Sequence, residues 1–344
     1  MVYVALYLAC MVVCYFLASK LRSQREFLGR IVNVITLASV FVLVLMMGMR
    51  MGSNEEIIAS LGTIGLQAFL FTIVVVIGGV LSVTAARKLL GIDKFGRLKE
   101  KTAKQVSAQN TEQAGKAGAD SKMEGDHESD AGENGSAASL MTWLIIIAVI
   151  LGLLFGYFYL RVNVEDIDAF NDKVGSLMTL GLCIMIGSIG FDMGLSGTVL
   201  AQVKHIGFRV LIFPAAVITG TAVSSVMMSF FLPLSARECI AIGFGFGWYT
   251  FAPVAISGAG HVVAGAVSFM HNVFRETLGI ILLPVLAKKI GYIEVCSLPG
   301  VAAGDMGLSL VEKALRPDIV VYSFAIGMSE SILIPLLVTL AIGA

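Results

Sequence analysis

Two acidic residues stand in apolar parts of the sequence, where charged side chains are rare. Glu276 precedes an uncharged run at residues 277–287, and Asp305 lies in the segment PGVAAGDMGLSL. A charge at the bilayer centre costs roughly 2.5–3.5 kcal/mol on insertion scales, so such residues usually face water, each other or a bound ion. The structural alternatives are an arginine partner for Glu276 and an N-cap role for Asp305. The pair predicts a site for a cation or a proton inside a membrane.

Other polar residues accompany these two acids. Asn272 lies four residues before Glu276 and shares its helix face. Arg275 is turned about 100° away from Glu276, so we expect it to meet the negative end of a broken helix instead. Glu330, between two serines of the last apolar segment, and Asp192, near the end of an earlier one, are weaker candidates.

Composition sets the class of protein. The chain of 344 residues is 57% hydrophobic and 14% charged, whereas soluble domains are about 45–50% apolar and about 25% charged. Its net charge of +0 implies no nucleic-acid partner. The five cysteines show no metal-binding spacing, so we expect no metal and no cofactor. The sequence therefore predicts an all-α polytopic membrane protein that is not an enzyme.

Apolar segments long enough to cross a bilayer recur along the chain. We expect membrane spans at residues 1–19, 31–52, 65–85, 140–160, 174–195, 206–232, 262–287 and 318–344. Residues 87–138, rich in Gly, Ala, Ser and charge, predict a flexible tether between a three-helix part (1–86) and a larger part with the substrate site (139–344). Basic residues follow the first, third and fifth spans, so both termini are expected outside and the tether in the cytoplasm.

An internal repeat gives the expected symmetry. Residues 48–71 resemble residues 190–213 without gaps. The two copies are separated by an odd number of predicted crossings, so they run in opposite directions. Inverted repeats of this kind build many secondary transporters, whose substrate site lies between the copies near the bilayer midplane. Chance similarity between two glycine-rich helices is the alternative.

The last third of the chain does not read as simple helices. Glycines and a proline interrupt residues 243–253, and a second short segment occupies residues 298–315. Broken backbone is tolerated in a membrane only where protein or water satisfies it. We therefore expect about eight crossings plus two broken or re-entrant segments, with about nine full crossings as the competing count. Within the first break, Gly245 and Gly247 would offer backbone to a ligand, and Trp248 and Tyr249 would stack on it or pack in the core.

Three blocks in order carry a family resemblance. The segments GFGWYT, HNVFRETLGIILLP and PGVAAGDMGLSL resemble the LysO-type lysine exporters, DUF340-like bacterial membrane proteins. The resemblance implies an L-lysine exporter driven by an ion gradient, with two essential membrane acids at the positions of Glu276 and Asp305. It also implies a fold like that of the cation/proton antiporter and bile-acid symporter group. The block around Asp305 has fewer Thr and Ser residues than the family usually shows, and His271 replaces an Asn or Ser. These differences remove possible donors to a substrate carboxylate or coupling ion and leave the two acids intact.

We therefore expect a secondary active exporter of L-lysine or a similar cationic amino acid in the bacterial inner membrane. Protons or sodium would be the coupling ion, the lipid bilayer the surroundings, and a homodimer stays open as the assembly. Alternatives are a proton/sodium exchanger, an exporter of another small amino or organic acid, and a non-transporting membrane subunit.

Overall fold

The computed structural model describes residues 2–21, 25–97, 147–164, 166–196, 208–304, 306–315 and 319–343. Within these ranges the chain forms helices joined by turns, with no β-strand element. Most of the predicted tether, residues 98–138, lies outside the described part of the chain.

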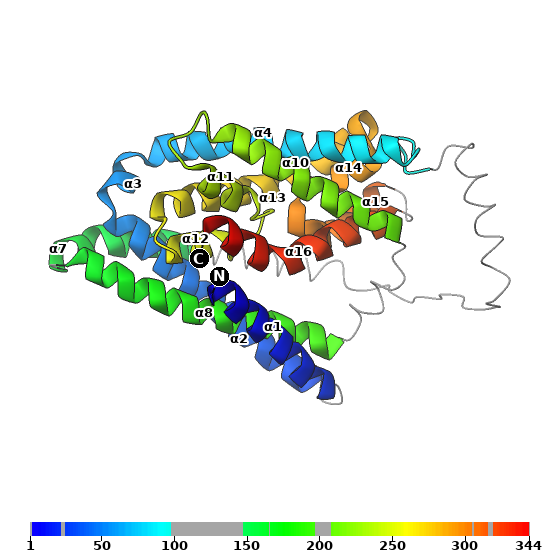
Figure 1. Ribbon diagram of the computed structural model, residues 1–344. Helices are drawn as coiled ribbons and strands as arrows, with labels where there is room; N and C mark the ends of the chain where they lie inside the picture. The colour runs from blue at the N-terminus through cyan, green and yellow to red at the C-terminus, as the bar shows by residue number, and fades with distance from the viewer. Residues whose placement is uncertain are drawn as a thin grey trace.

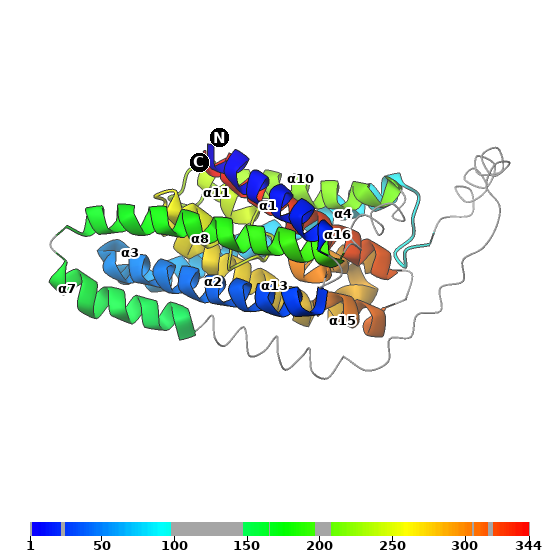
Figure 2. The same cartoon turned by 90° about the horizontal axis from the view of Figure 1, so that it is seen from below.

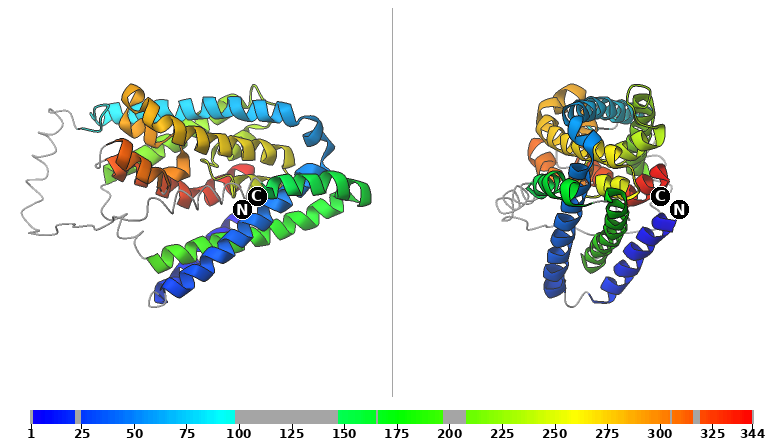
Figure 3. Two further views of the ribbon diagram at one scale, coloured as in Figure 1. Left: turned by 180° about the vertical axis from the view of Figure 1, so that it is seen from behind. Right: turned by 90° about the vertical axis from the view of Figure 1, so that its left-hand side faces the viewer.

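The helices form two groups that incline away from each other (Figures 1 and 3). The smaller group contains α1 (Val2–Lys20), α2 (Arg25–Ser53), the helix Ile147–Asn163 and α8 (Ile167–Ser196). The helix Ile147–Asn163 contains a π-helical turn, η3 (Gly156–Leu160), and ends in α7 (Arg161–Asn163). The short α3 (Glu55–Ala59) leads from α2 to the larger group.

The larger group holds the rest of the described chain. Its long helices are α4 (Leu61–Leu89), α10 (Ile212–Met228), α13 (Val262–Ile290) and α16 (Val320–Ile342). The view from below places the start of α1 beside the end of α16 (Figure 2). The shorter elements are η4 (Phe208–Leu211), α11 (Ala236–Gly243), α12 (Ala252–Gly258), α14 (Tyr292–Cys296), η5 (Gly300–Gly304) and α15 (Met306–Ala314).

Glycines at a spacing of four allow two helices of the smaller group to approach closely. Gly48 and Gly52 of α2 face Gly152 and Gly156 of the helix Ile147–Asn163. A Cβ added at Gly48 would lie 2.7 Å from the carbonyl oxygen of Val149. Small residues at this spacing are typical of helix pairs in membranes, where close backbone contact replaces the hydrophobic effect as the driving force.

Five helices have the length and hydropathy needed to cross a membrane: Phe27–Ser53, Leu61–Leu89, Ala169–Leu195, Arg209–Met228 and Val320–Ile342. Shorter apolar helices occupy Ala9–Lys20 and Ile147–Asn163. The helix α13, Val262–Ile290, is 29 residues long and carries the charged residues 275, 276, 288 and 289. The chain is therefore a multi-pass membrane protein.

The ends of several elements differ from the sequence prediction. α10 ends at Met228, whereas the expected span ran to residue 232. α4 continues to Leu89, and the chain stays folded to Arg97, beyond residue 87, where we placed the start of the tether. Arg87 is buried and its Nε lies 2.5 Å from Oε1 of Glu294, which fixes the end of α4 to α14.

Candidate functional site

The helix predicted to be interrupted at residues 243–253 is interrupted there. α11 begins with a capping box between Ser235 and Glu238 and ends at Gly243, and α12 begins at Ala252. Residues 244–251 between them, called here the first break, include Phe246 at φ +44° and Gly247 at φ +87°. Positive φ is rare for a residue with a Cβ, and it stops the helix because the next N–H can no longer reach back four residues.

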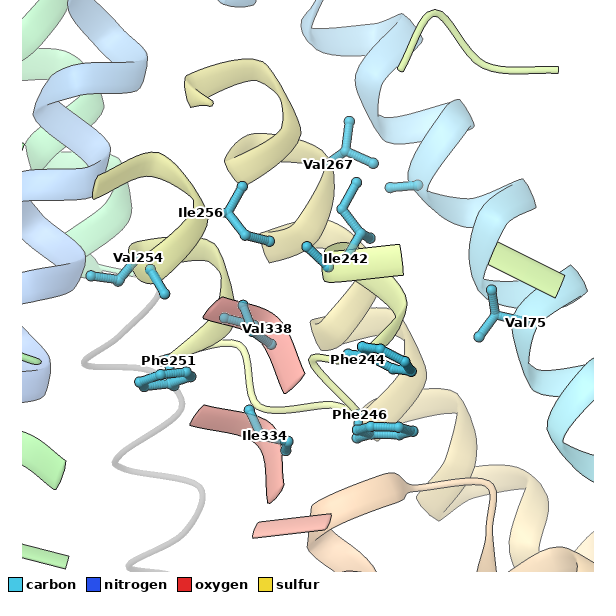
Figure 4. Close-up of a cluster of buried hydrophobic side chains, with 14 of the residues drawn as sticks. Val75, Ile242, Phe244, Phe246, Phe251, Val254, Ile256, Val267, Ile334 and Val338 are labelled. Atoms are coloured by element: carbon cyan, nitrogen blue, oxygen red, sulfur yellow. The ribbon is translucent and has the colours of Figure 1, made fainter. Parts of the chain in front are cut away.

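A second break lies between α14 and η5, at residues 297–299, and the chain turns there through Gly300 at φ +66°. The two interrupted regions touch at one place, the crossing point, where the N–H of Val301 donates a 2.9 Å hydrogen bond to the carbonyl oxygen of Phe246. A Cβ at Gly300 would lie 2.6 Å from the carbonyl carbon of Phe246, so only glycine fits. Figure 4 shows Phe244 and Phe246 side by side on the first break.

Asn272 on α13 anchors the first break. Its Oδ1 accepts a 2.8 Å hydrogen bond from the N–H of Gly247. Its Nδ2 donates to the carbonyl oxygen of Ser268 at 2.8 Å and to the hydroxyl of Ser268 at 3.1 Å. A Cβ at Gly245 would lie 2.8 Å from Cγ of Asn272, so this close approach also requires glycine. The buried amide therefore satisfies a backbone group that the missing helix would otherwise have paired.

Arg275, one turn further along α13, also reaches the crossing point. Its side chain is buried, and its Cζ lies 5.0 Å from the centre of the Phe246 ring, within cation–π range. Glu330 on α16 is also buried and interacts electrostatically with Arg275. α16 packs closely on η5, where Ser323 donates a 2.8 Å hydrogen bond to the carbonyl oxygen of Ala303 and Gly327 lies against Gly304. The guanidinium thus lies between the two interrupted regions and a carboxylate of α16.

Glu276 is half-buried on α13 and faces the first break. Its Cβ would be 3.7 Å from a Cβ added at Gly247, on the same side as Asn272. Asp305, the other predicted carboxylate, lies outside the described residues, so the meeting of the two acids stays a prediction. The described neighbours Gly304 and Met306 end η5 and begin α15.

The remaining predicted site residues divide into two groups. Trp248 and Tyr249 are half-buried in the first break, and their rings pack on Phe251 at 5.3 Å and Phe269 at 6.4 Å. Asp192 is exposed in the last turns of α8, in the smaller helix group. The structure thus brings Gly245, Gly247, Asn272, Arg275 and Glu276 together with Glu330, and leaves Asp192 apart.

Sequence reasoning gave too little weight to several buried polar groups. Arg50, near the end of α2, is buried and donates a hydrogen bond to the carbonyl oxygen of Ser257, in α12. His271 is buried and shares a 2.9 Å hydrogen bond between its Nδ1 and the Thr72 hydroxyl of α4. Ser268 could have been found, because it lies four residues before Asn272 on the same helix face. The partners of Arg50 and His271 come from distant helices and leave no local signal in the sequence.

Among the described residues, no group of three His, Cys, Asp or Glu side chains could hold a metal ion.

Comparison with known proteins gives consistent matches. A family model described as "Lysine exporter LysO" matches residues 146–342, more than half of the chain. A Haemophilus influenzae protein named "Putative lysine exporter" is 24% identical over 193 residues, which cover 56% of this chain and 94% of that protein. An Escherichia coli K12 protein named "Lysine exporter LysO" is 24% identical over 157 residues, 46% of this chain and 52% of that protein. The alignment thus spans about half of the Escherichia coli relative. No solved structure matches the chain.

Proposed function

This chain belongs to the lysine exporter LysO family, and we propose that it exports L-lysine and close cationic analogues across the bacterial inner membrane in exchange for protons or another cation. The observation that carries the proposal is the position of Glu276. It lies beside the unwound backbone of Gly247, where two interrupted helical regions touch. Unwound backbone and a carboxylate at membrane depth are the parts from which secondary transporters build cation sites.

In this mechanism Glu276, together with Asp305, binds an ammonium group or protons in turn. The ionised carboxylates attract lysine from the cytoplasm. Protonation from the outside removes that attraction, so the substrate leaves and the protons travel inward. The backbone hydrogen bonds within the first break form turns and not a continuous helix, and Asn272 and Val301 tie it to its neighbours. We propose that this segment changes its shape during the cycle.

The inverted repeat at residues 48–71 and 190–213 supplies the symmetry for alternating access. Its two copies cover the end of α2 with the start of α4, and the end of α8 with the start of α10. In the folded chain α2 packs on α8 and α4 packs on α10. α2 and α8 run antiparallel, because Leu43 lies against Gly181 and Arg50 lies near Gly175, and this fits two copies of opposite direction.

The energy for export depends on how many protons return. Moving one positive charge outward against a negative interior costs roughly 2.3 kcal/mol per 100 mV. A one-for-one exchange of lysine for a proton moves no net charge and is driven only by the pH difference, about 1.36 kcal/mol per pH unit. Two carboxylates would allow a second proton to return for each lysine exported. The exchange would then move net charge inward, and the membrane potential would add to the driving force.

Counterflow in proteoliposomes tests the proposal. Vesicles loaded with unlabelled L-lysine should accumulate labelled L-lysine from outside. Glu276→Gln should reduce the initial rate by about 100-fold, because a neutral amide loses the charge-assisted bond to the ammonium group. Glu312→Gln, at an exposed position of α15, is the matched control and should keep the wild-type rate.

Wild-type counterflow in the Glu276→Gln variant would refute the role of Glu276. A wild-type protein that moves protons or sodium across the vesicle membrane without stimulation by internal lysine would instead be an ion exchanger.

A further inference from the structure

Arg275 and Glu330 combine complete burial with unused hydrogen-bonding groups. Their exposed fractions are 1% and 0%. Nε and Nη1 of Arg275 and both carboxylate oxygens of Glu330 have no hydrogen-bond partner in the described part of the chain. No direct ion pair within 4.0 Å joins the two side chains, although their charges interact.

This arrangement differs from the buried ion pair of Arg87 and Glu294 in the larger helix group. Arg87 and Glu294 are in direct contact at 2.5 Å, and Arg87 also donates to the carbonyl oxygen of Ile92. Buried charges usually need both a partner and hydrogen bonds, because desolvation costs several kcal/mol per ion. Arg275 and Glu330 balance each other's charge only through space, so their donors and acceptors are available to a third group.

The head of an α-amino acid matches these two side chains. It carries a carboxylate and an ammonium on the same carbon. The guanidinium of Arg275 has unpaired donors at Nε and Nη1, which can donate to a carboxylate, and a glutamate accepts hydrogen bonds from an ammonium. We propose that Arg275 and Glu330 form the receptor for the substrate's amino-acid head, Arg275 binding the α-carboxylate and Glu330 the α-ammonium.

This inference rests on the proposed function and divides the substrate between two places. Glu276 follows Arg275 in the chain but is turned about 100° around α13. The side-chain ammonium of lysine therefore goes to Glu276, and the head goes to the adjacent face of the helix. L-Lysine has two ammonium groups and one carboxylate, while Glu276, Glu330 and Arg275 offer two carboxylates and one guanidinium. Because the charges of the three side chains are opposite to those of the three substrate groups, a site for a cationic substrate can contain an arginine.

The head receptor is closed in this structure by residues outside the long helices. The Phe246 ring covers Arg275, and the 2.9 Å bond from the N–H of Val301 holds Phe246 in place. Both residues belong to interrupted regions instead of long helices. Opening of the crossing point therefore exposes Arg275 without unfolding α13 or α16.

Analogues that lack one part of the head test the proposal on the wild-type protein. The probes compete with labelled L-lysine in counterflow: cadaverine lacks the carboxylate, and 6-aminohexanoate lacks the α-ammonium. Each should bind about 10- to 100-fold more weakly than L-lysine, because it leaves one buried charged group of the receptor without its hydrogen bonds. Competition by cadaverine as strong as that by L-lysine would overturn the role of Arg275.

Two variants then test which side chain binds which group of the amino-acid head. Arg275→Gln should weaken the binding of L-lysine to about that of cadaverine. The binding of cadaverine itself should be unchanged or tighter. Glu330→Gln should remove the preference for L-lysine over 6-aminohexanoate. Arg50→Gln, at a buried arginine that bonds to Ser257 away from the crossing point, is the control for a structural defect and should preserve the ratios between ligands. Equal losses for all three ligands in the Arg275 and Glu330 variants would contradict the proposal.

The outcomes separate this inference from the proposed function. A wild-type protein that transports L-lysine without discriminating against the analogues would refute the head receptor but would still support lysine export. A wild-type protein that shows no lysine counterflow would sink the proposed function itself. The wild-type competition series decides between these results even if a variant fails to fold.

Discussion

Replacing Asn272 by alanine should release the first break from α13. The amide accepts the Gly247 N–H at 2.8 Å and donates to the carbonyl oxygen of Ser268 at 2.8 Å and to its hydroxyl at 3.1 Å. The main effect is on Gly247, whose N–H would lose its partner at a buried position.

The size of the effect follows from these contacts. An unsatisfied buried donor costs about 1–3 kcal/mol, and each lost hydrogen bond contributes about 0.5–1.5 kcal/mol net. The Ser268 carbonyl and hydroxyl lose the same amide, so we expect Asn272→Ala to reduce the free energy of unfolding by about 2–4 kcal/mol. Lysine counterflow should fall as well, because Gly247 would no longer be held beside Glu276.

Denaturant titration in mild detergent measures the free energy, with apparent melting temperature as a second readout. Asn33→Ala, at an exposed position of α2, is the matched control and should change stability by less than about 0.5 kcal/mol. A double-mutant cycle with Ser268→Ala should give a coupling energy of about 0.5–1 kcal/mol. If Asn272→Ala is no more destabilising than Asn33→Ala, the amide does not hold the break and the reasoning fails.

Three further substitutions test other parts of the fold. Glu294→Gln leaves Arg87 buried without its ion-pair partner and should cost about 3–5 kcal/mol, measured by detergent unfolding; a loss no larger than that of the exposed Lys288→Gln would contradict this. Gly300→Ala places a Cβ at φ +66° and against the facing backbone, so the melting temperature and lysine counterflow should both fall; unchanged counterflow would show that the crossing point tolerates displacement. Gly152→Leu should separate α2 from the helix Ile147–Asn163 and lower the melting temperature, whereas the same change at Gly29, where an added Cβ meets nothing within 4 Å, should be tolerated.

Only part of the candidate site could be predicted from the sequence. The position of Asn272 four residues before Glu276 predicted a shared helix face, and both residues do face the first break. Glu330 was a weaker candidate because the family that the sequence resembles does not generally show an acid at this position. Arg275 is 55 positions away, on a different helix, and only the packing of α16 on η5 brings the two residues together.

By itself, the sequence determined the membrane class, the approximate positions of five long apolar helices and the interruption at residues 243–253. Each of these follows from local composition: apolar length, the separation of charge, and glycine and proline in a helix interior. Only the tertiary structure decided that the N–H of Val301 meets the carbonyl of Phe246, that Arg87 pairs with Glu294, and that Arg50 holds the end of α12. The physical reason is that helical periodicity fixes which residues share a face of one helix. The choice of the facing helix depends on close packing along the whole length of both.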